Sequence, residues 1–273
     1  MSLYIPKDSV NSSTLPTSPI RLGIMGVAGS GKTFSALTFP NPVVLDLDNK
    51  LGGYREANPA VSFPVLPFWN REFVEGTLKV INNTKTRTID TSYPHNVRDA
   101  VDKWLTSEGP KLTPEQTLIV DSFTALNDGF ANQTNLPWEV EYSRSGEIDG
   151  FAFWKKLLAY NSRICTLLKA LPCNVVAIFH ELPDRNENGT IMGLKPLLQG
   201  QSADKCPGYF TDFYRQRVFT KDNPGPFKIE DPKAQVYAWQ TCKDKYFQIA
   251  CKSRHLIPDY VVANFSSLTN GQA

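Results

Sequence analysis

The sequence lacks several features that would place a protein in a familiar class. None of its apolar runs reaches the roughly 18 residues of a membrane-spanning helix, and it has no apolar segment of the signal-peptide type. Its five cysteines form no C-x-x-C or Cys/His pattern with the spacing of metal ligands. We therefore expect reduced thiols in a cytoplasmic protein, with no membrane partner and no structural metal site.

A strong excess of charge of either sign is also absent. The chain has 29 Lys and Arg against 27 Asp and Glu, which gives a net charge of +2. This balance neither requires nor excludes a nucleic-acid partner, because a basic groove can exist on a nearly neutral protein. With 273 residues, 41% of them hydrophobic, we expect one α/β domain over residues 20–273, preceded by a flexible segment at 1–19 that is rich in Ser, Thr and Pro.

One segment matches the phosphate-binding P-loop pattern G-x-x-x-x-G-K-[ST] at every position: Gly26, Val27, Ala28, Gly29, Ser30, Gly31, Lys32 and Thr33. The flanking residues predict a buried strand at 22–25 and a helix from 33 that prolines stop. The glycines let successive N–H groups face a triphosphate, while Lys32 would contact the β- and γ-phosphates and Thr33 would bind Mg²⁺. The sequence therefore predicts a site for a nucleoside triphosphate and Mg²⁺.

Polar side chains end three further apolar runs. Asp46 and Asp48 end the run at 43–48, Asp121 follows 117–120, and His180 follows 174–179. Because ligands of open α/β sheets bind beyond the carboxyl ends of the strands, we expect these side chains near the P-loop. Asp121 is then a candidate Mg²⁺ ligand, and His180 is either a γ-phosphate sensor or an ordinary buried histidine.

The rest of the chain has a coarser pattern. We predict helices at 96–105 and 153–171, an irregular excursion up to about residue 95, and loops at 127–149 and 181–208. Strands are predicted at 213–220, 235–242 and 247–252, the last two joined by a turn. They would add antiparallel strands to a mostly parallel sheet.

The segment 118–126 resembles the Walker B strand of the RecA family, in which Ser follows the Asp as Ser122 follows Asp121. AAA-type motors have their catalytic Glu at that position, so the base must lie elsewhere. The resemblance covers about residues 20–256 and implies a RecA-like P-loop NTPase core. It places Asp48 where the family has a catalytic Glu and His180 at the family's sensor position. Lys252 and Arg254 resemble the basic pair that RecA-like filaments extend to a neighbour's ATP.

The chain is more closely similar to the short RecA relatives encoded by bacteriophages, which are associated with ATP binding and annealing of single-stranded DNA. This resemblance implies single-stranded DNA as a partner, self-association into a filament or ring, a phage or host single-strand-binding protein as a further partner, and the cytoplasm of a bacterial host. It places the two predicted loops where the family binds DNA. Bases would stack on Trp138 or Tyr142, and phosphates would contact basic side chains: Arg185, Lys195 and Lys205.

The leading hypothesis is an ATP-dependent, single-stranded-DNA-binding recombinase or annealing protein, with Lys32, Asp48, His180, Lys252 and Arg254 as catalytic residues and ATP between subunits. A nucleoside or nucleotide kinase is an alternative, although the sequence has no Arg-rich lid. Another is a scaffold that binds ATP and hardly turns it over. A GTPase is disfavoured, because no Asn-Lys-x-Asp motif is present.

Overall fold

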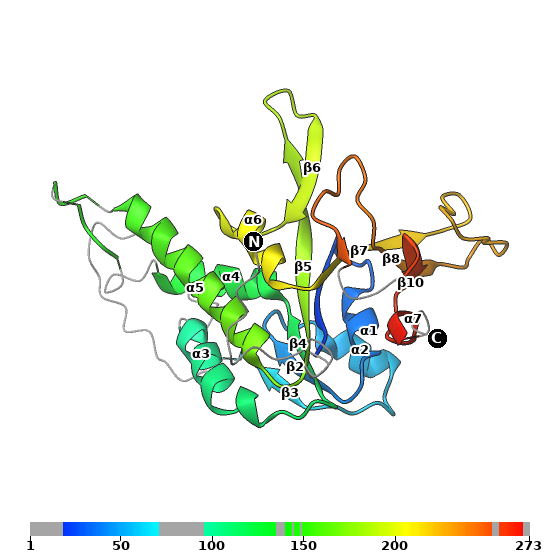
Figure 1. Ribbon diagram of the computed structural model, residues 1–273, viewed down its shortest axis with the longest axis horizontal. Coiled ribbons are helices and arrows are strands. Elements are labelled where there is room, and N and C mark those ends of the chain that lie inside the picture. Colours follow the sequence, from blue (N-terminus) through cyan, green and yellow to red (C-terminus); the bar gives the residue numbers. More distant parts are fainter. Residues whose placement is uncertain are drawn as a thin grey trace, which may run out of the picture.

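One sheet runs through the protein, with helices on both of its faces (Figure 1). The computed structural model describes residues 19–70, 96–134, 140–143, 145–147, 149–252 and 257–269. The described strands are β1 (Arg21–Gly26), β2 (Pro42–Asp46), β3 (Val65–Pro67), β4 (Thr117–Asp121), β5 (Asn174–Arg185), β6 (Ile191–Pro196), β7 (Asp212–Phe219), β8 (Val236–Gln240), β9 (Cys251–Lys252) and β10 (Tyr260–Val262).

The strands lie in the order β10-β8-β7-β1-β5-β4-β2-β3. All neighbours from β7 to β3 are parallel, whereas β8 and β10 add antiparallel strands at the β7 edge. This confirms the predicted mostly parallel sheet with antiparallel strands from the C-terminal part of the chain. Strand β5 separates β1 from β4, so the strand that leads to His180 lies between those leading to the P-loop and Asp121.

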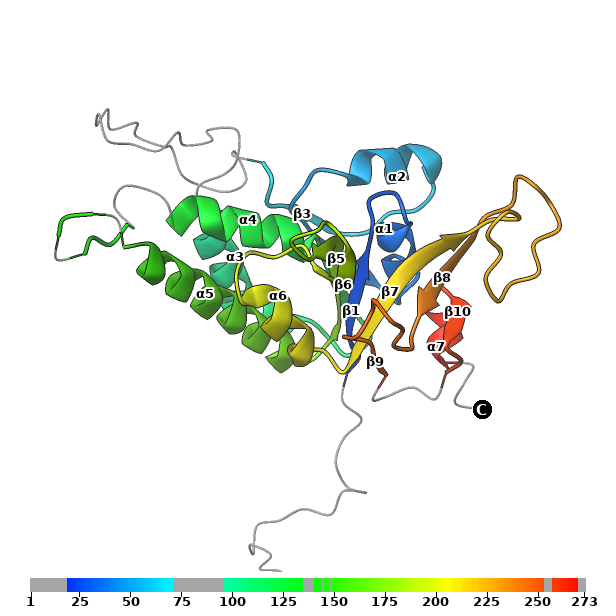
Figure 2. The ribbon, with the colours of Figure 1, turned by 90° about the horizontal axis from the view of Figure 1, so that it is seen from above.

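The helices form two layers (Figure 2). One face of the sheet carries α3 (Val97–Ser107), α4 (Phe123–Thr134), α5 (Gly150–Ala170), α6 (Ser202–Lys205) and the 3₁₀ turn η3 (Cys206–Tyr209). The other face carries α1 (Lys32–Ala36), α2 (Leu51–Ala57) and α7 (Ser266–Thr269). A second 3₁₀ turn, η2 (Gly109–Lys111), follows α3. No helix in the described part of the chain is long and apolar enough to cross a membrane.

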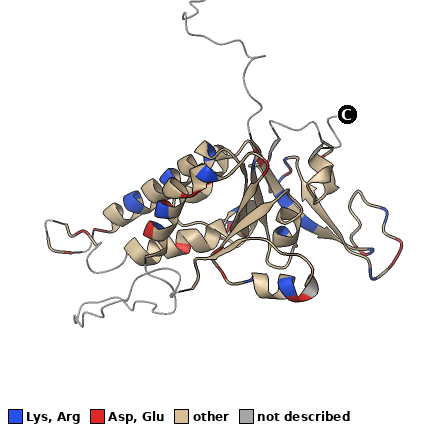
Figure 3. Cartoon of the chain, turned by 90° about the horizontal axis from the view of Figure 1, so that it is seen from below, with Lys and Arg blue, Asp and Glu red and all other residues tan. Residues whose placement is uncertain are grey.

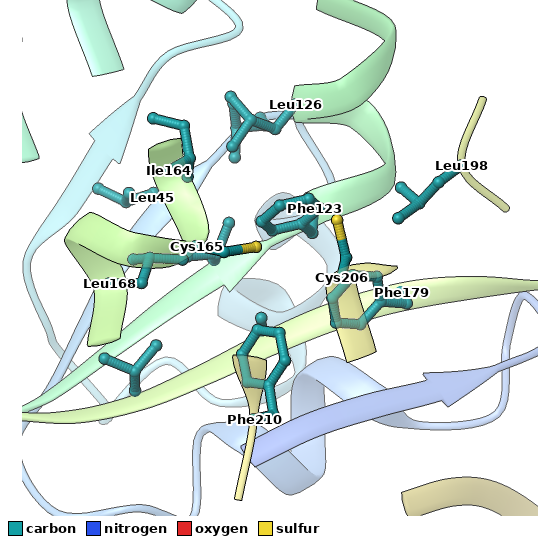
Figure 4. Close-up of a cluster of buried hydrophobic side chains, with 14 of the residues drawn as sticks. Leu45, Phe123, Leu126, Ile164, Cys165, Leu168, Phe179, Leu198, Cys206 and Phe210 are labelled. Carbon is teal, nitrogen blue, oxygen red and sulfur yellow. The ribbon is translucent and has the colours of Figure 1, made fainter. Parts of the chain in front are cut away.

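Alternation along the strands supplies both hydrophobic layers. In β5, Val175 and Phe179 face the α3–α5 layer, whereas Val176 and Ile178 face the α1–α2 layer. Phe179 lies 5.1 Å from Phe123, measured between ring centroids. Figure 4 shows this core, in which Cys165 and Cys206 also lie. Both thiols are free and buried, as is that of Cys173.

The predicted loop at 127–149 is wrong in its first part, because α4 continues to Thr134. Polar residues of this segment suggested a loop. They are buried in the helix and form hydrogen bonds with residues from distant segments. Asn127 accepts a hydrogen bond from the Gln199 N–H (3.0 Å), and Gln133 donates one to Asp99 (2.8 Å). Paired in this way, a polar side chain can occupy a buried helix face.

The predicted loop at 181–208 is also wrong. Strand β5 runs past His180 and pairs antiparallel with β6, so residues 181–196 form a projecting hairpin, here named the β5–β6 arm (Figure 1). Its turn is shaped by Asn186, whose side chain accepts from two backbone N–H groups, and by Gly189 at φ 77°. Asn and Gly at these positions are turn-forming residues.

The strand predicted at 247–252 is wrong over most of its length, because only β9 (Cys251–Lys252) forms there. Strand β8 pairs with β7 and β10, while β9 pairs with the first residues of β7. Between β8 and β9, the Asp244 side chain accepts from the backbone N–H groups of Tyr246 and Phe247. These bonds hold a local turn in place of a longer strand. The predictions for residues 1–18 and 71–95 lie outside the described residues.

Arg21, at the start of β1, forms hydrogen bonds with backbone carbonyls at the end of α5. The guanidinium is buried and donates to the carbonyls of Lys169 (3.1 Å), Leu171 (2.5 Å) and Cys173 (2.7 Å). Carbonyl groups at a helix C-terminus have no partner within the helix. Arg21 therefore satisfies buried acceptors that the fold would otherwise leave unpaired.

We expect Arg21→Met to lower the free energy of unfolding by roughly 3 kcal/mol, because several buried carbonyls lose their donor. Arg163→Met is the matched control. Arg163 lies at the surface and pairs with Asp102, and an exposed pair is worth less than about 1 kcal/mol. Urea denaturation measures both values, and equal losses would contradict the assigned role of Arg21.

Candidate functional site

The P-loop connects the end of β1 to the start of α1. Gly29 and Gly31 have φ values of 76° and 83°, a backbone conformation that favours glycine. Ser30 closes the loop by donating from its hydroxyl to the Val27 carbonyl (2.8 Å). A Cβ on Gly31 would lie 2.6 Å from the Tyr237 ring. Gly31 is therefore required both by its φ angle and by the aromatic side chain packed against it.

Lys32 is held on the loop that it follows. Its ammonium donates to the carbonyls of Gly26 (2.9 Å) and Val27 (2.7 Å), and the residue is only 6% exposed. Burial lowers the pKa of Lys32 to about 8, although Asp121 opposes the shift. A phosphate beside the ammonium would stabilise its charged form.

Thr33 and Asp121 bring two oxygen atoms together. The Thr33 hydroxyl donates to Asp121 Oδ2 (2.7 Å). Burial raises the pKa of Asp121 to about 6, and the neighbouring charges of Asp48 and Asp46 add to the shift. A hydroxyl beside an ionised but poorly solvated carboxylate suits a hard divalent cation, so these residues fit Mg²⁺.

Ser122, which follows Asp121, has a structural role as the N-cap of α4. Its hydroxyl accepts from the Ala125 N–H (3.1 Å), which is an N-cap interaction at the start of α4. The residue is fully buried. The position after Asp121 therefore supports the helix and provides no catalytic carboxylate.

Asp46 and Asp48 have different surroundings, although the sequence pointed both toward the P-loop. Asp46 is buried and accepts from the Trp69 indole (3.0 Å) and the Asn49 N–H (3.0 Å). It thereby shapes the loop after β2, in which Asn49 has φ 54°. Only Asp48 of the two lines the cavity described below.

Asp48, Lys50 and His180 form a polar cluster. Lys50 Nζ lies 2.5 Å from Asp48 Oδ2 and 3.4 Å from His180 Nε2, and His180 Nε2 lies 3.8 Å from the same carboxylate oxygen. Burial alone would raise the pKa of Asp48, but hydrogen bonds with His180 and Lys50 outweigh it and lower that pKa. The backbone N–H of His180 donates to the Thr124 hydroxyl (3.0 Å).

These groups line one cavity of about 880 Å³, within the size range of small-ligand sites. It contains Lys32, Thr33, Asp48, Asp121 and His180 together with Ala28, Gly29 and Gly31. Other lining residues had no role in the sequence analysis, among them Lys50, Tyr54, Gln235 and Tyr237. Lys50 follows Asp48 on the same loop, which was a usable signal, whereas Tyr237 reaches the P-loop only through the order of the strands.

Of the predicted trans-acting pair, only the backbone of Lys252 is described, and it lies away from the P-loop. Lys252 lies in β9, opposite Asp212, and Asp212 is in register with Leu22 near the start of β1. The P-loop begins at the other end of β1, so Lys252 lies toward the opposite edge of the sheet. Arg254 lies outside the described residues, and the roles of both stay predictions.

The predicted DNA-binding residues are spread over several elements. Arg185 lies in the β5–β6 arm and donates to the Gly189 carbonyl (2.7 Å), and Lys195 in the same arm pairs with Asp184 (2.9 Å). Lys205 ends α6, and Tyr142 is 61% exposed before α5. Trp138 lies outside the described residues. The DNA-binding roles of all these residues stay predictions.

Basic residues also recur along α5 (Figure 3): Lys155, Lys156, Arg163 and Lys169. Two of them are paired with acidic side chains. Lys156 lies 2.9 Å from Glu141, and Arg163 lies 2.5 Å from Asp102. These pairs reduce the net positive charge of the helix face.

The comparison with protein families adds an independent observation. A family model described as an AAA domain matches residues 18–242. The chain belongs to the AAA domain family. With its P-loop and parallel sheet, this AAA domain is of the P-loop ATPase type, although Ser122 follows Asp121 in place of the Glu of AAA-type motors. The RecA and phage resemblance remains a prediction.

No curated protein matches this AAA domain. Among solved structures it is similar to an ATPase from the type III secretion system of pathogenic bacteria, at 14% sequence identity and a TM-score of 0.37. The match covers 74% of this chain and 51% of the other. The chain therefore spans about half the length of that ATPase.

The raised pKa of Asp121 leads to a stability prediction for the protein without nucleotide and in EDTA. The native state binds a proton more tightly than the unfolded chain, so the ionised carboxylate destabilises the native state above about pH 6. We expect Asp121→Asn to raise the free energy of unfolding at pH 8 by roughly 1–3 kcal/mol. The gain should shrink as the pH falls from 6 toward 4.

Urea denaturation at pH 8 and at pH 4.5 measures this difference. Comparison of the two pH values is the internal control, because packing changes caused by the substitution would act at both. A loss of stability at pH 8, or an equal gain at both values, would contradict the assigned charge cost.

Proposed function

We propose that the protein is an ATP-hydrolysing, single-stranded-DNA-binding protein of phage recombination or annealing, with ATP bound between subunits. The observation that carries the proposal is the continuity of β5. This strand contributes His180 to the cavity and continues directly into the projecting β5–β6 arm. A nucleotide beside His180 and a ligand on the arm would therefore act on the same strand.

The cavity supports the ATPase part of the proposal. The P-loop N–H groups and Lys32 would bind the phosphates, and Thr33 and Asp121 would hold Mg²⁺, which would neutralise charge on the β- and γ-phosphates. Asp48 would orient the attacking water, and His180 would contact the γ-phosphate. Asp48 and Asp121 are the carboxylates among the described lining residues.

The base of the arm supports coupling to DNA. Glu181, directly after His180, is buried and forms a bidentate pair with Arg215 on β7, at 2.7 and 2.9 Å. Because Glu181 follows His180 in the chain, a shift of His180 toward a γ-phosphate would also move Glu181 and its ion pair with Arg215. On the arm, a DNA phosphate would replace Asp184 as the partner of Lys195, an exchange at an exposed pair that costs little.

The place of β9 supports ATP at a subunit interface. Because Lys252 starts from the opposite edge of the sheet, a contact with ATP would require the cavity of a neighbouring chain. A basic group supplied in trans would add to the charge stabilisation given by Lys32.

We expect single-stranded DNA to increase ATP turnover, with an effect that falls steeply between 50 and 200 mM salt, roughly as expected for phosphate contacts. Phosphate release with and without an oligonucleotide measures this. Lys195→Gln should weaken the stimulation, whereas Lys228→Gln, on an exposed lysine paired with Glu230, is the control. Turnover that is indifferent to DNA would reject the DNA-binding part and favour a kinase or a nucleotide-gated scaffold.

Two variants separate nucleotide binding from turnover. Lys32→Ala should abolish ATP binding, because the P-loop loses its phosphate-binding cation. Asp48→Asn should retain binding and lose turnover by about 100-fold or more, as expected when a general base is removed. Calorimetric binding and phosphate release report the two effects. Wild-type turnover in Asp48→Asn would show that the base had been assigned to the wrong residue.

A further inference from the structure

A second lysine faces the cavity that contains Lys32. Lys50 lines it together with Lys32, Asp48 and His180. Two ammonium groups that act on each other in one cavity are unfavourable unless anionic groups lie beside them. In the described structure, Lys50 is compensated by Asp48 at 2.5 Å, whereas Lys32 donates to backbone carbonyls.

We propose that Lys50 moves away from Asp48 and binds the terminal phosphate of the bound nucleoside triphosphate. This inference rests on the proposed function and names a residue of the same site. Lys50 lies 3.4 Å from His180, which would contact the γ-phosphate, and pairs with Asp48, which would orient the attacking water. The P-loop amides and Lys32 would bind the phosphates from the P-loop side, so a second lysine at this end adds positive charge for the γ-phosphate, which ADP lacks.

The surroundings of Lys50 permit this movement. Its side chain is 57% exposed, so the ammonium can turn without disturbing packed neighbours. The Asp48 side chain is only 15% exposed, so loss of the ion pair has a cost, which a γ-phosphate offsets because it carries more negative charge than a carboxylate. Lys50 also precedes α2 without donating a capping bond to it. Its ion pair with Asp48 is thus separable from the helix.

Departure of Lys50 would also release Asp48. In the described structure Asp48 Oδ2 is engaged by Lys50, and Asp48 Oδ1 is buried without a hydrogen-bond partner. Transfer of Lys50 to the γ-phosphate would leave Asp48 beside His180, with its carboxylate able to accept a hydrogen bond from the attacking water. ADP has no γ-phosphate, so Lys50 then stays on Asp48. One lysine thereby links recognition of ATP to activation of the candidate base.

The test compares the affinities of a fluorescent non-hydrolysable ATP analogue and of fluorescent ADP, both with Mg²⁺. Lys50→Gln should weaken the ATP analogue at least ten-fold and change ADP affinity less than two-fold. Lys50→Arg, which keeps the charge, should retain most of the discrimination. Lys111→Gln is the control, because Lys111 is an exposed lysine paired with Glu108 at 2.7 Å.

The outcomes separate this inference from the proposed function. Equal weakening of both nucleotides, or unchanged affinity for the ATP analogue, would overturn it and leave Lys50 as an ion-pair partner of the loop only. If the wild type binds neither nucleotide, the proposed function fails and the inference falls with it. Should Lys50→Gln unfold, Lys50→Met and Lys50→Arg carry the same comparison, with circular dichroism reporting the fold.

Discussion

The site depends on two buried groups of opposite charge, Lys32 and Asp121, which water solvates poorly. The pKa of Lys32 is lowered to about 8 and that of Asp121 is raised to about 6, in both cases chiefly by burial. Each group would be stabilised by a partner of opposite sign. A polyphosphate with a divalent cation supplies both partners at once, so the electrostatics of the described residues already favour this class of ligand.

The sheet topology explains why these charges meet. The P-loop, Asp121 and His180 follow β1, β4 and β5, and β5 lies between the other two strands. Parallel strands bring such endings to one edge of the sheet. The same order makes β5 the connection to the β5–β6 arm, through Glu181 and its pair with Arg215. The cavity and the arm are thus joined by one strand, which is buried at residues 175–179 and partly exposed from His180 onward.

The sequence could predict the parts that local patterns determine. The P-loop, the strand that leads to Asp48, the strands that contain Asp121 and His180, and the mostly parallel sheet follow from motif spacing and apolar runs. The rest depends on long-range contacts. Asn127 is polar yet buried because Gln199 pairs with it, and Tyr237 meets Gly31 only because β8 joins the sheet beside β7. The approach of His180 to Asp48 and Lys50 likewise depends on a contact between distant segments.

The position of the candidate base follows from packing at the start of α4. Ser122 is fully buried and caps that helix, so a Glu there would need both space and a replacement cap. Asp121 is engaged by Thr33, which leaves Asp48 as the other carboxylate among the described residues of the cavity. Asp48 stands on a loop and reaches less far than Glu. A neighbouring residue could hold the Asp48 carboxylate in place before the nucleotide binds and move away when the γ-phosphate is present. Lys50 lies in the position to do this.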